Sequence, residues 1–149
     1  MKKLALIASV VMLGVLTAGA GTIGVAQFND GGGTTDTQFF PASLQASFIT
    51  LKNNDGVTNT YTIAYYTLTG TSRGPSGANT FTIGGNSART WRPVQTDPNE
   101  GAGSLIPGAT GTGGAGTASI AYSDTNPPSG MVRIFVGGAQ SAYAWTLLP

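Results

Sequence analysis

Apolar and polar residues alternate over much of the chain beyond residue 43, with the two-residue period of a β-strand. Tyr61, Ile63 and Tyr65, for example, fall on one face of a strand, and the residues between them fall on the other. Clusters of Gly, Asn, Pro and Ser separate such runs and are typical of turns. The pattern predicts about seven short strands, at 44–51, 59–68, 80–83, 88–94, 117–122, 131–136 and 142–148.

This series of strands predicts an all-β fold. Turn signals at Asn53–Gly56 and Gly84–Ser87 join neighbouring runs, and we interpret the second as the turn of a hairpin between 80–83 and 88–94. No helical period persists after residue 20. Short strands joined by turns favour an antiparallel β-sandwich with a jelly-roll or immunoglobulin-like topology, which we place at residues 43–149.

The first residues are typical of a targeting segment. Lys2 and Lys3 precede an apolar run and a group of small residues, the order found in a secretory signal peptide. The apolar and small residues from Leu4 onward number 17, whereas a membrane-spanning helix needs about 20. Cleavage after Ala20 and cleavage after Ala26 both fit, so the signal peptide covers residues 1–26 at its longest. We therefore expect a secreted protein, extracellular or at the cell surface, with no membrane segment after cleavage.

Composition narrows the classes of function. Charged residues make up 9% of the chain, Gly accounts for 23 residues, and there is no Cys or His. The absence of His and Cys excludes Ser–His and Cys–His nucleophilic catalysis and thiolate zinc sites. No acid–base pair is recognisable either, so we expect no enzyme. After loss of Lys2 and Lys3, five basic residues stand against six acids, and this net charge of −1 gives no electrostatic footprint for nucleic acid.

The loop around residue 97 holds the closest pair of acids in the chain. Asp97, Asn99 and Glu100 offer carboxylate and amide oxygens on a Gly-containing turn, which is the ligand chemistry that calcium prefers. The segment lacks a full six-ligand pattern, and a solvated turn begun by Asp97 accounts for the same residues. We predict no cofactor and keep calcium as the alternative.

Aromatic residues form a second candidate site. Trp91 stands between Arg89 and Arg92, and Tyr65 and Tyr66 are neighbours on a predicted strand. If they were exposed, these rings would form a platform for a polysaccharide of the cell wall or matrix. If it were buried, Trp91 would belong to the core with the arginines at its rim, which is the common position of Trp in such folds. We favour the core position.

The segment before the predicted sandwich contains an unexplained apolar stretch. Ile23, Val25 and Phe28 precede three consecutive glycines, Gly31–Gly33, which favour a flexible arm at residues 27–42. A tethered apolar arm would be a liability in water. It would be satisfied by adding as a strand to the sheet of another copy, and such a heterologous contact propagates into a fibre. A disordered terminus is the alternative.

Two short elements carry a family resemblance. The run Gly21–Asp30 begins with Gly-Thr and ends with Phe-Asn-Asp, and Phe39–Leu44 follows it after a spacer. This order resembles the start of the TasA/camelysin family of secreted biofilm-fibre proteins, although Pro41–Leu44 replaces the family's Ala-Gly-Thr-Leu. The resemblance implies a jelly-roll subunit polymerised by donor-strand complementation. It also implies cleavage after Ala26, with Gln27, Phe28 and residues 37–44 as the donor.

These observations predict a secreted structural subunit that assembles with itself, head to tail, into extracellular filaments of a biofilm matrix or cell-surface fibre. The candidate donor residues are Ile23, Val25, Phe28, Phe39, Phe40 and Leu44. The alternative is a monomeric secreted module that binds carbohydrate or a surface through Trp91, Tyr65 or Tyr66.

Overall fold

The computed structural model describes residues 19–30, 45–75, 77–93, 106–110, 114–136 and 141–147. This part of the chain contains eight β-strands and no helix, and so no helix that could cross a membrane. The strands are β1 (Gly21–Asp30), β2 (Gln45–Lys52), β3 (Asn59–Tyr66), β4 (Thr80–Ile83), β5 (Ala88–Trp91), β6 (Gly114–Tyr122), β7 (Ser129–Val136) and β8 (Ser141–Thr146).

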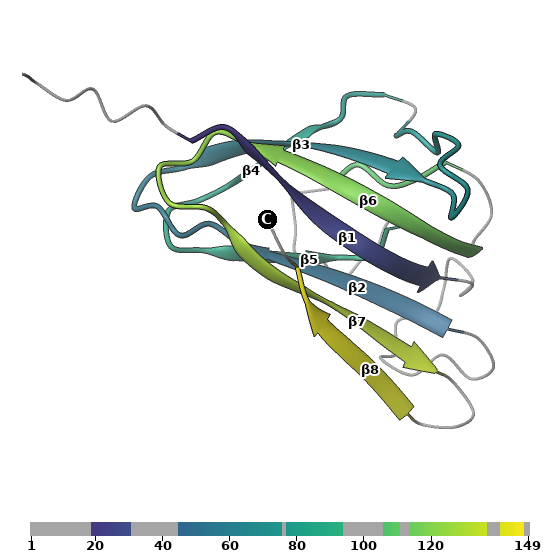
Figure 1. The fold of residues 1–149 in the computed structure, drawn as a ribbon. Coiled ribbons are helices and arrows are strands. Elements are labelled where there is room, and N and C mark those ends of the chain that lie inside the picture. The colour runs from purple at the N-terminus through teal and green to yellow at the C-terminus, as the bar shows by residue number, and fades with distance from the viewer. Residues whose placement is uncertain are drawn as a thin grey trace, which may run out of the picture.

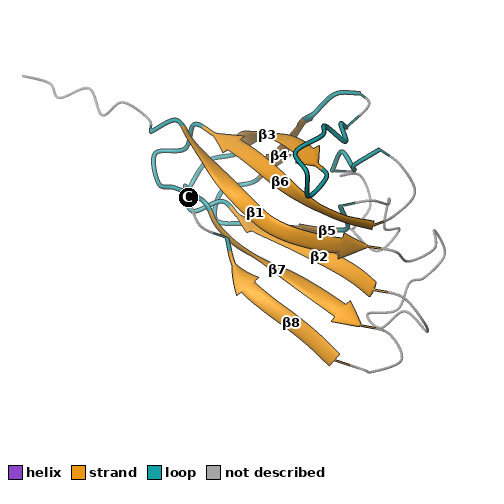
Figure 2. Ribbon diagram, turned by 45° about the vertical axis from the view of Figure 1, so that its right-hand side comes forward, coloured by secondary structure: helices purple, strands orange, loops and turns teal. Residues whose placement is uncertain are grey.

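The strands form two four-stranded sheets, and the predicted all-β sandwich is therefore confirmed. One sheet has the order β1-β6-β3-β4 and the other has the order β5-β2-β7-β8. Neighbouring strands are antiparallel in both sheets. The two sheets face each other in Figures 1 and 2, and β1 lies against β2 and β7 of the opposite sheet.

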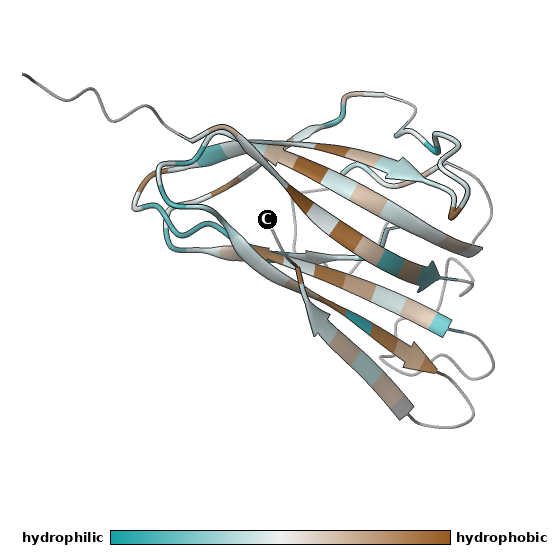
Figure 3. Ribbon diagram, in the orientation of Figure 1, coloured by the Kyte–Doolittle hydropathy of each residue, from teal (hydrophilic) through white to brown (hydrophobic). Residues whose placement is uncertain are grey.

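The alternation of apolar residues produces the core between the sheets. Tyr61, Ile63 and Tyr65 of β3 are fully buried, whereas the residues between them are not. Figure 3 shows a similar alternation of brown and pale bands along β1. The buried cluster comprises Ile23, Val25, Phe28, Ile49, Leu51, Tyr61, Ile63, Tyr65, Phe81, Ile83, Trp91, Ile106, Ala109, Ala118, Ile120, Val132 and Leu147.

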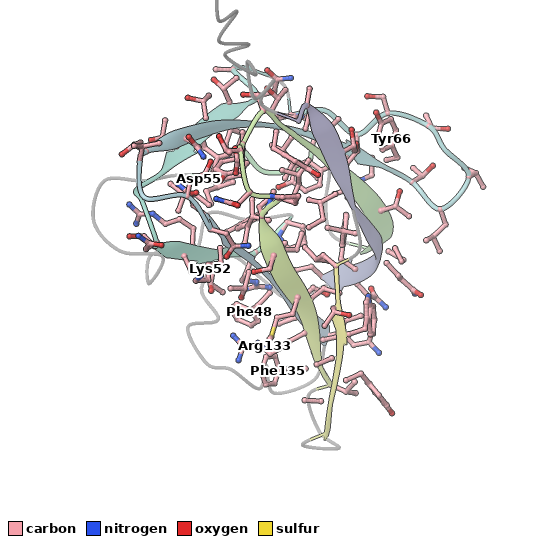
Figure 4. The ribbon with its side chains drawn as sticks, turned by 60° about the vertical axis from the view of Figure 1, so that its left-hand side comes forward. Phe48, Lys52, Asp55, Tyr66, Arg133 and Phe135 are labelled. Atoms are coloured by element: carbon pink, nitrogen blue, oxygen red, sulfur yellow. The ribbon has the colours of Figure 1, made fainter. Side chains whose placement is uncertain are left out.

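Strand β2 differs from the others because it is buried on both faces. Ile49 and Leu51 belong to the core, and Phe48 on the opposite face is only 8% exposed. The Phe48 ring packs edge to face against Phe135 of β7, with the ring centroids 5.5 Å apart. Figure 4 shows both rings beside Arg133. This two-sided burial explains why apolar residues occupy both faces of β2, as the adjacent Phe48 and Ile49 do, instead of alternating strictly with polar ones.

The sandwich includes residues that the sequence pattern places outside it. Residues 21–30 form strand β1, which pairs with β6 of the same chain, so the expected boundary at residue 43 is wrong. Ile23, Val25 and Phe28 are buried in the core rather than exposed on an arm. Their near-alternating positions suit an edge strand that covers one side of the sandwich. Phe39, Phe40 and Leu44 lie outside the described residues.

The turn at Gly84–Ser87 does not close a hairpin. Strand β4 pairs with β3 in one sheet, and β5 pairs with β2 in the other, so this turn crosses between the sheets. The turn at Asn53–Gly56 crosses between them as well. The two crossovers touch, because a side chain at Gly85 would come within 2.3 Å of the Gly56 backbone. Alternation shows which side chains face the core, but it does not show which strands pair.

Asp55 holds this end of the sandwich together. Its carboxylate accepts hydrogen bonds from the backbone N–H of Thr125 (2.9 Å) and Asn126 (3.0 Å), and from the side-chain amides of Asn126 (2.7 Å) and Asn59 (2.9 Å). The bond from Asn59, together with those from Asn126 and Thr125, lowers the pKa of the Asp55 carboxyl below its usual value, although burial opposes the shift. The ionised carboxylate therefore ties the β2–β3 crossover to the β6–β7 turn.

We expect Asp55 to make the fold sensitive to acid. Because its pKa is lower in the folded state than in the unfolded state, its contribution to stability is complete above the unfolded value of about 4 and is lost as the pH falls below it. An Asp55→Asn variant should be less stable than the wild type at pH 7. The difference between the two free energies of unfolding should shrink between about pH 5 and pH 2, as urea titrations would measure. A constant difference over that range would contradict this assignment.

Candidate functional site: the seat of strand β1

Strand β1 lies at the edge of its sheet, and the surface that receives it is the most specific feature of the described structure. Ile23 lies opposite Ile120 of β6, and Val25 lies opposite Ala118. The register shifts between Val25 and Phe28, after which Phe28 lies opposite Gly116. The shift is a bulge, and it returns Phe28 to the buried face of the strand. Phe28, Asn29 and Asp30 at the end of β1 contact a set of residues that we call the seat of β1: Gln45, Ser47, Tyr65, Arg73, Arg92 and Gly116.

The Phe28 ring occupies a socket formed by three residues. A Cβ atom on Gly116 would lie 2.5 Å from the end of the ring, so only glycine leaves room for it. The ring meets Tyr65 edge to face, with the centroids 6.0 Å apart, and the Arg73 guanidinium lies 5.8 Å from its centroid. These are the favoured geometries for aromatic pairs and for a cation over a ring. The socket therefore fits one aromatic side chain at one position of β1.

Asp30, the last residue of β1, forms a buried ion pair with Arg92. The Arg92 Nε donates to Asp30 Oδ2 at 2.9 Å, and its Nη2 donates to Oδ1, so the pair is bidentate. Asp30 is fully buried and Arg92 is 4% exposed. Arg92 follows β5, which belongs to the opposite sheet, so the pair joins the two sheets. Two charges out of water are tolerated only in such a close and well-bonded geometry.

Asn29 is held by side chains of β2. Its backbone N–H donates to the Ser47 hydroxyl at 2.7 Å, and that hydroxyl donates to the Asn29 carbonyl at 2.8 Å. The Asn29 side-chain amide donates to the side chain of Gln45. Three consecutive residues of β1 thus meet three kinds of partner. The ring of Phe28 fills the socket, the backbone of Asn29 bonds the Ser47 hydroxyl, and Asp30 has a counter-charge. A strand of another sequence, or the same strand in another register, would not satisfy them together.

The sequence pattern by itself points to only part of this seat. Ile23, Val25 and Phe28 were singled out as apolar residues that need cover, and the structure covers them with the chain's own core. Asp30 and Gly116 were not singled out. Nothing in the sequence pairs Asp30 with Arg92, 62 residues away. The arginine beside Trp91 and the aspartate that ends the Phe-Asn-Asp element were the available signals.

Trp91 lies in the core, which is the position favoured from the sequence, and the residues of the alternative aromatic platform do not form one. Trp91 and Tyr65 are fully buried, and the Trp91 ring N–H donates to the Tyr65 hydroxyl at 2.9 Å. That hydroxyl donates to the Pro107 carbonyl at 2.8 Å. Tyr66 lies on the other face of β3 and is half-buried, and Figure 4 shows it apart from Phe48 and Phe135. Since Trp91 and Tyr65 cannot reach a sugar, the carbohydrate-binding alternative loses most of its proposed site.

Asp97, Asn99 and Glu100 lie outside the described residues. Among the residues that the structure does describe, no group of three or more acids could hold a metal ion.

Asp124 accepts a hydrogen bond of 2.6 Å from the Tyr61 hydroxyl. Burial raises the pKa of the Tyr61 hydroxyl above its usual range, and the bond to Asp124 adds to the shift. The neutral Tyr61 phenol therefore anchors the core through its hydrogen bond to Asp124.

Comparisons with known proteins concern the fold alone. No protein-family model and no curated protein matches the chain. The structure is similar to a crystal structure of Thermotoga maritima 1070, with a TM-score of 0.50 and 10% sequence identity over 84% of this chain and 88% of that chain. At this identity the likeness supports the arrangement of the strands and carries no statement about activity.

We expect the Phe28 socket to reject a methyl group. A Gly116→Ala variant should lose about 1–3 kcal/mol of unfolding free energy, because the new Cβ would meet both the Phe28 ring and the Tyr66 carbonyl at 2.5 Å. Gly24→Ala on β1 is the matched control, since no neighbouring atom of the described residues lies within 4 Å of its Cβ position. Urea unfolding followed by tryptophan fluorescence would measure both. Equal effects of the two substitutions would contradict the socket.

We expect the Asp30–Arg92 pair to behave as a coupled unit. Asp30→Asn or Arg92→Met alone leaves one buried charge without its counter-charge and should cost about 3–5 kcal/mol. The double variant should cost clearly less than the sum of the two, as a double-mutant cycle of urea unfolding would measure. Lys52→Met, on an exposed residue, should change the stability by less than about 0.5 kcal/mol. Additive effects of the two substitutions would contradict the pairing.

Proposed function

We propose that the protein is a secreted structural subunit that assembles into extracellular filaments by exchanging strand β1 between copies. In the assembled form, the β1 strand of one subunit occupies the seat of the next. The observation that carries this proposal is the seat itself: an edge strand supplies core side chains and is recognised in a single register by buried, sequence-specific contacts.

Exchange of β1 preserves the contacts of the monomer. Each subunit loses its own Phe28, Asn29 and Asp30 from the seat and receives the same three residues from a neighbour. The free energy of these contacts then holds two subunits together, which is why exchange of identical elements is an easy route to assembly. If every subunit donates its strand to one neighbour and accepts a strand from another, the contact is heterologous and does not close, and a filament results.

The connection to the rest of the chain permits this exchange. Residues 31–44 separate β1 from β2, and this segment of 14 residues includes Gly31–Gly33. At about 3.3 Å per extended residue it can span up to roughly 46 Å, which exceeds the width of a domain of this size. Loss of a leader before Gly21 would leave β1 attached through this connection alone.

The position of β1 bears on where the leader ends. Cleavage after Ala26 would remove Ile23 and Val25, both of which fill the core. Cleavage after Ala20 leaves the whole strand in place. The fold therefore supports cleavage after Ala20, and the intact mass of the secreted protein would distinguish the two sites.

A pair of cysteines across β1 and β6 tests the exchange directly. Thr22 and Ala121 lie opposite each other in the register and are both exposed, and the natural chain has no Cys to interfere. A Thr22→Cys/Ala121→Cys variant, assembled under reducing conditions and then oxidised, should give a ladder of covalent multimers on a denaturing gel. Oxidised before assembly at high dilution, it should give a covalently closed monomer that forms no filaments in electron micrographs.

The hairpin partners Thr60 and Thr82 provide the matched control. They also lie opposite each other and are both exposed, but β3 and β4 stay within one subunit in either form. A Thr60→Cys/Thr82→Cys variant should therefore cross-link only within the monomer. If the Thr22→Cys/Ala121→Cys variant gave monomers alone from concentrated protein, strand exchange would be excluded.

A further inference from the structure

Strand β8 is the outermost strand of its sheet and lies at the lower edge of the molecule in Figure 1. Within the described residues it pairs with β7 on one side, with Thr146 opposite Met131, and with no strand on the other. The Leu147 N–H continues this pairing and donates to the Gly130 carbonyl at 2.9 Å. Because consecutive residues of a strand point their backbone groups to opposite sides, the odd-numbered residues of β8 face β7. The N–H and C=O groups of Ala142, Ala144 and Thr146 therefore point toward the open edge.

The other sheet edges that the structure describes are protected in ways that β8 is not. Strand β1 carries a bulge, and β4 and β5 have only four residues each. Bulges and short strands are devices that prevent pairing with another chain, as are charged residues and prolines. The sequence of β8, Ser-Ala-Tyr-Ala-Trp-Thr, contains neither a charge nor a proline. Its open edge is thus the one best suited to accept a further strand.

We propose that β8 pairs with β8 of a second copy, antiparallel and about a two-fold axis at Ala144. The two four-stranded sheets would then form one continuous sheet of eight strands. A second copy is the occupant because the edge is self-complementary: the three residues with free backbone groups are placed symmetrically about Ala144. Identical strands without charge also approach each other without repulsion.

One register satisfies the whole edge. With Ala144 opposite its own copy, Ala142 lies opposite Thr146, and all three free N–H groups and all three free C=O groups of each strand find partners. The same register sets Tyr143 opposite Trp145 of the second copy, at the positions where cross-strand side chains come closest. Tyr143 is 60% exposed in the single subunit, so pairing would cover a large apolar ring. A shift by two residues in either direction leaves the free groups of one residue of each strand unpaired, and it replaces the two contacts between Tyr143 and Trp145 by a single contact of one ring with its own copy.

This pairing does not depend on the exchange of β1. It is isologous and closes after two copies, whereas the exchange is heterologous and open. Both can operate in one assembly, because β1 and β8 belong to different sheets. The β8 pairing would then join filaments side by side in twos, and without the exchange it would give a simple dimer.

Single cysteines on the edge test the pairing and its register together. The exposed Ala144 would face itself, and a hydrogen-bonded antiparallel pair has its Cα atoms about 5.5 Å apart, within disulfide range. The full chain as secreted, carrying Ala144→Cys, should therefore oxidise to a covalent dimer at least about tenfold faster than Ala142→Cys at the same micromolar concentration. The Ala142→Cys thiols would be offset along the strands by about 13 Å. Denaturing gels measure both rates, and a single cysteine cannot produce larger species.

Charge variants provide a second readout in solution. Ala144→Lys alone and Ala144→Glu alone should each sediment without the β8 dimer, because like charges would meet at the axis, and a mixture of the two should restore it. Thr60→Lys, on the exposed face of β3, is the charge-matched control and should leave the dimer intact. Circular dichroism would verify that each variant is folded. Equal oxidation rates at positions 142 and 144, or no restoration in the mixture of folded variants, would overturn the proposal.

Discussion

The buried ion pair between Asp30 and Arg92 is the interaction on which the rest of the sandwich depends most directly. It closes the end of β1, the edge strand of one sheet, onto the residue that follows β5 in the other. Charges this deeply buried are costly unless they meet in a close geometry, and here both hydrogen bonds of the fork are made. The pair therefore selects one register for β1. The Phe28 socket and the two hydrogen bonds between Ser47 and the Asn29 backbone select the same register.

This selectivity connects the fold to the proposed assembly. A strand that packed only through apolar side chains could slip by two residues at modest cost. Strand β1 cannot slip in this way, since a shift would bury Asp30 without its counter-charge and would press Phe28 against residues other than Gly116. A seat of this kind distinguishes the correct strand from others, whether the strand comes from the same copy or from a neighbour. Exchange between copies thus keeps the specificity that the monomer already possesses.

The edges of the two sheets then divide the contacts between copies. The β1 edge is recognised by side chains and carries a bulge that discourages further pairing. The β8 edge presents backbone groups and two aromatic rings without any charge. The first arrangement suits a directional contact that can repeat along a filament, and the second suits a symmetric contact that ends after two copies. Together they describe a subunit with few charges, no cysteine and a core built almost wholly from strand residues.

By itself, the sequence determined the elements that depend on local pattern. Alternation such as that of Tyr61, Ile63 and Tyr65, together with the turn residues between runs, was enough to predict the fold class. It also predicted seven of the eight described strands to within a few residues. The pairing of those strands was decided only by the tertiary structure. The same turn residues suit a hairpin and a crossover between sheets. The sequence therefore predicts a hairpin at Gly84–Ser87, where the structure has a crossover. The place of β1 and its seat also needed the fold, because Phe28 meets Gly116 and Asp30 meets Arg92 across long stretches of chain, and a local pattern carries no record of contacts between distant residues.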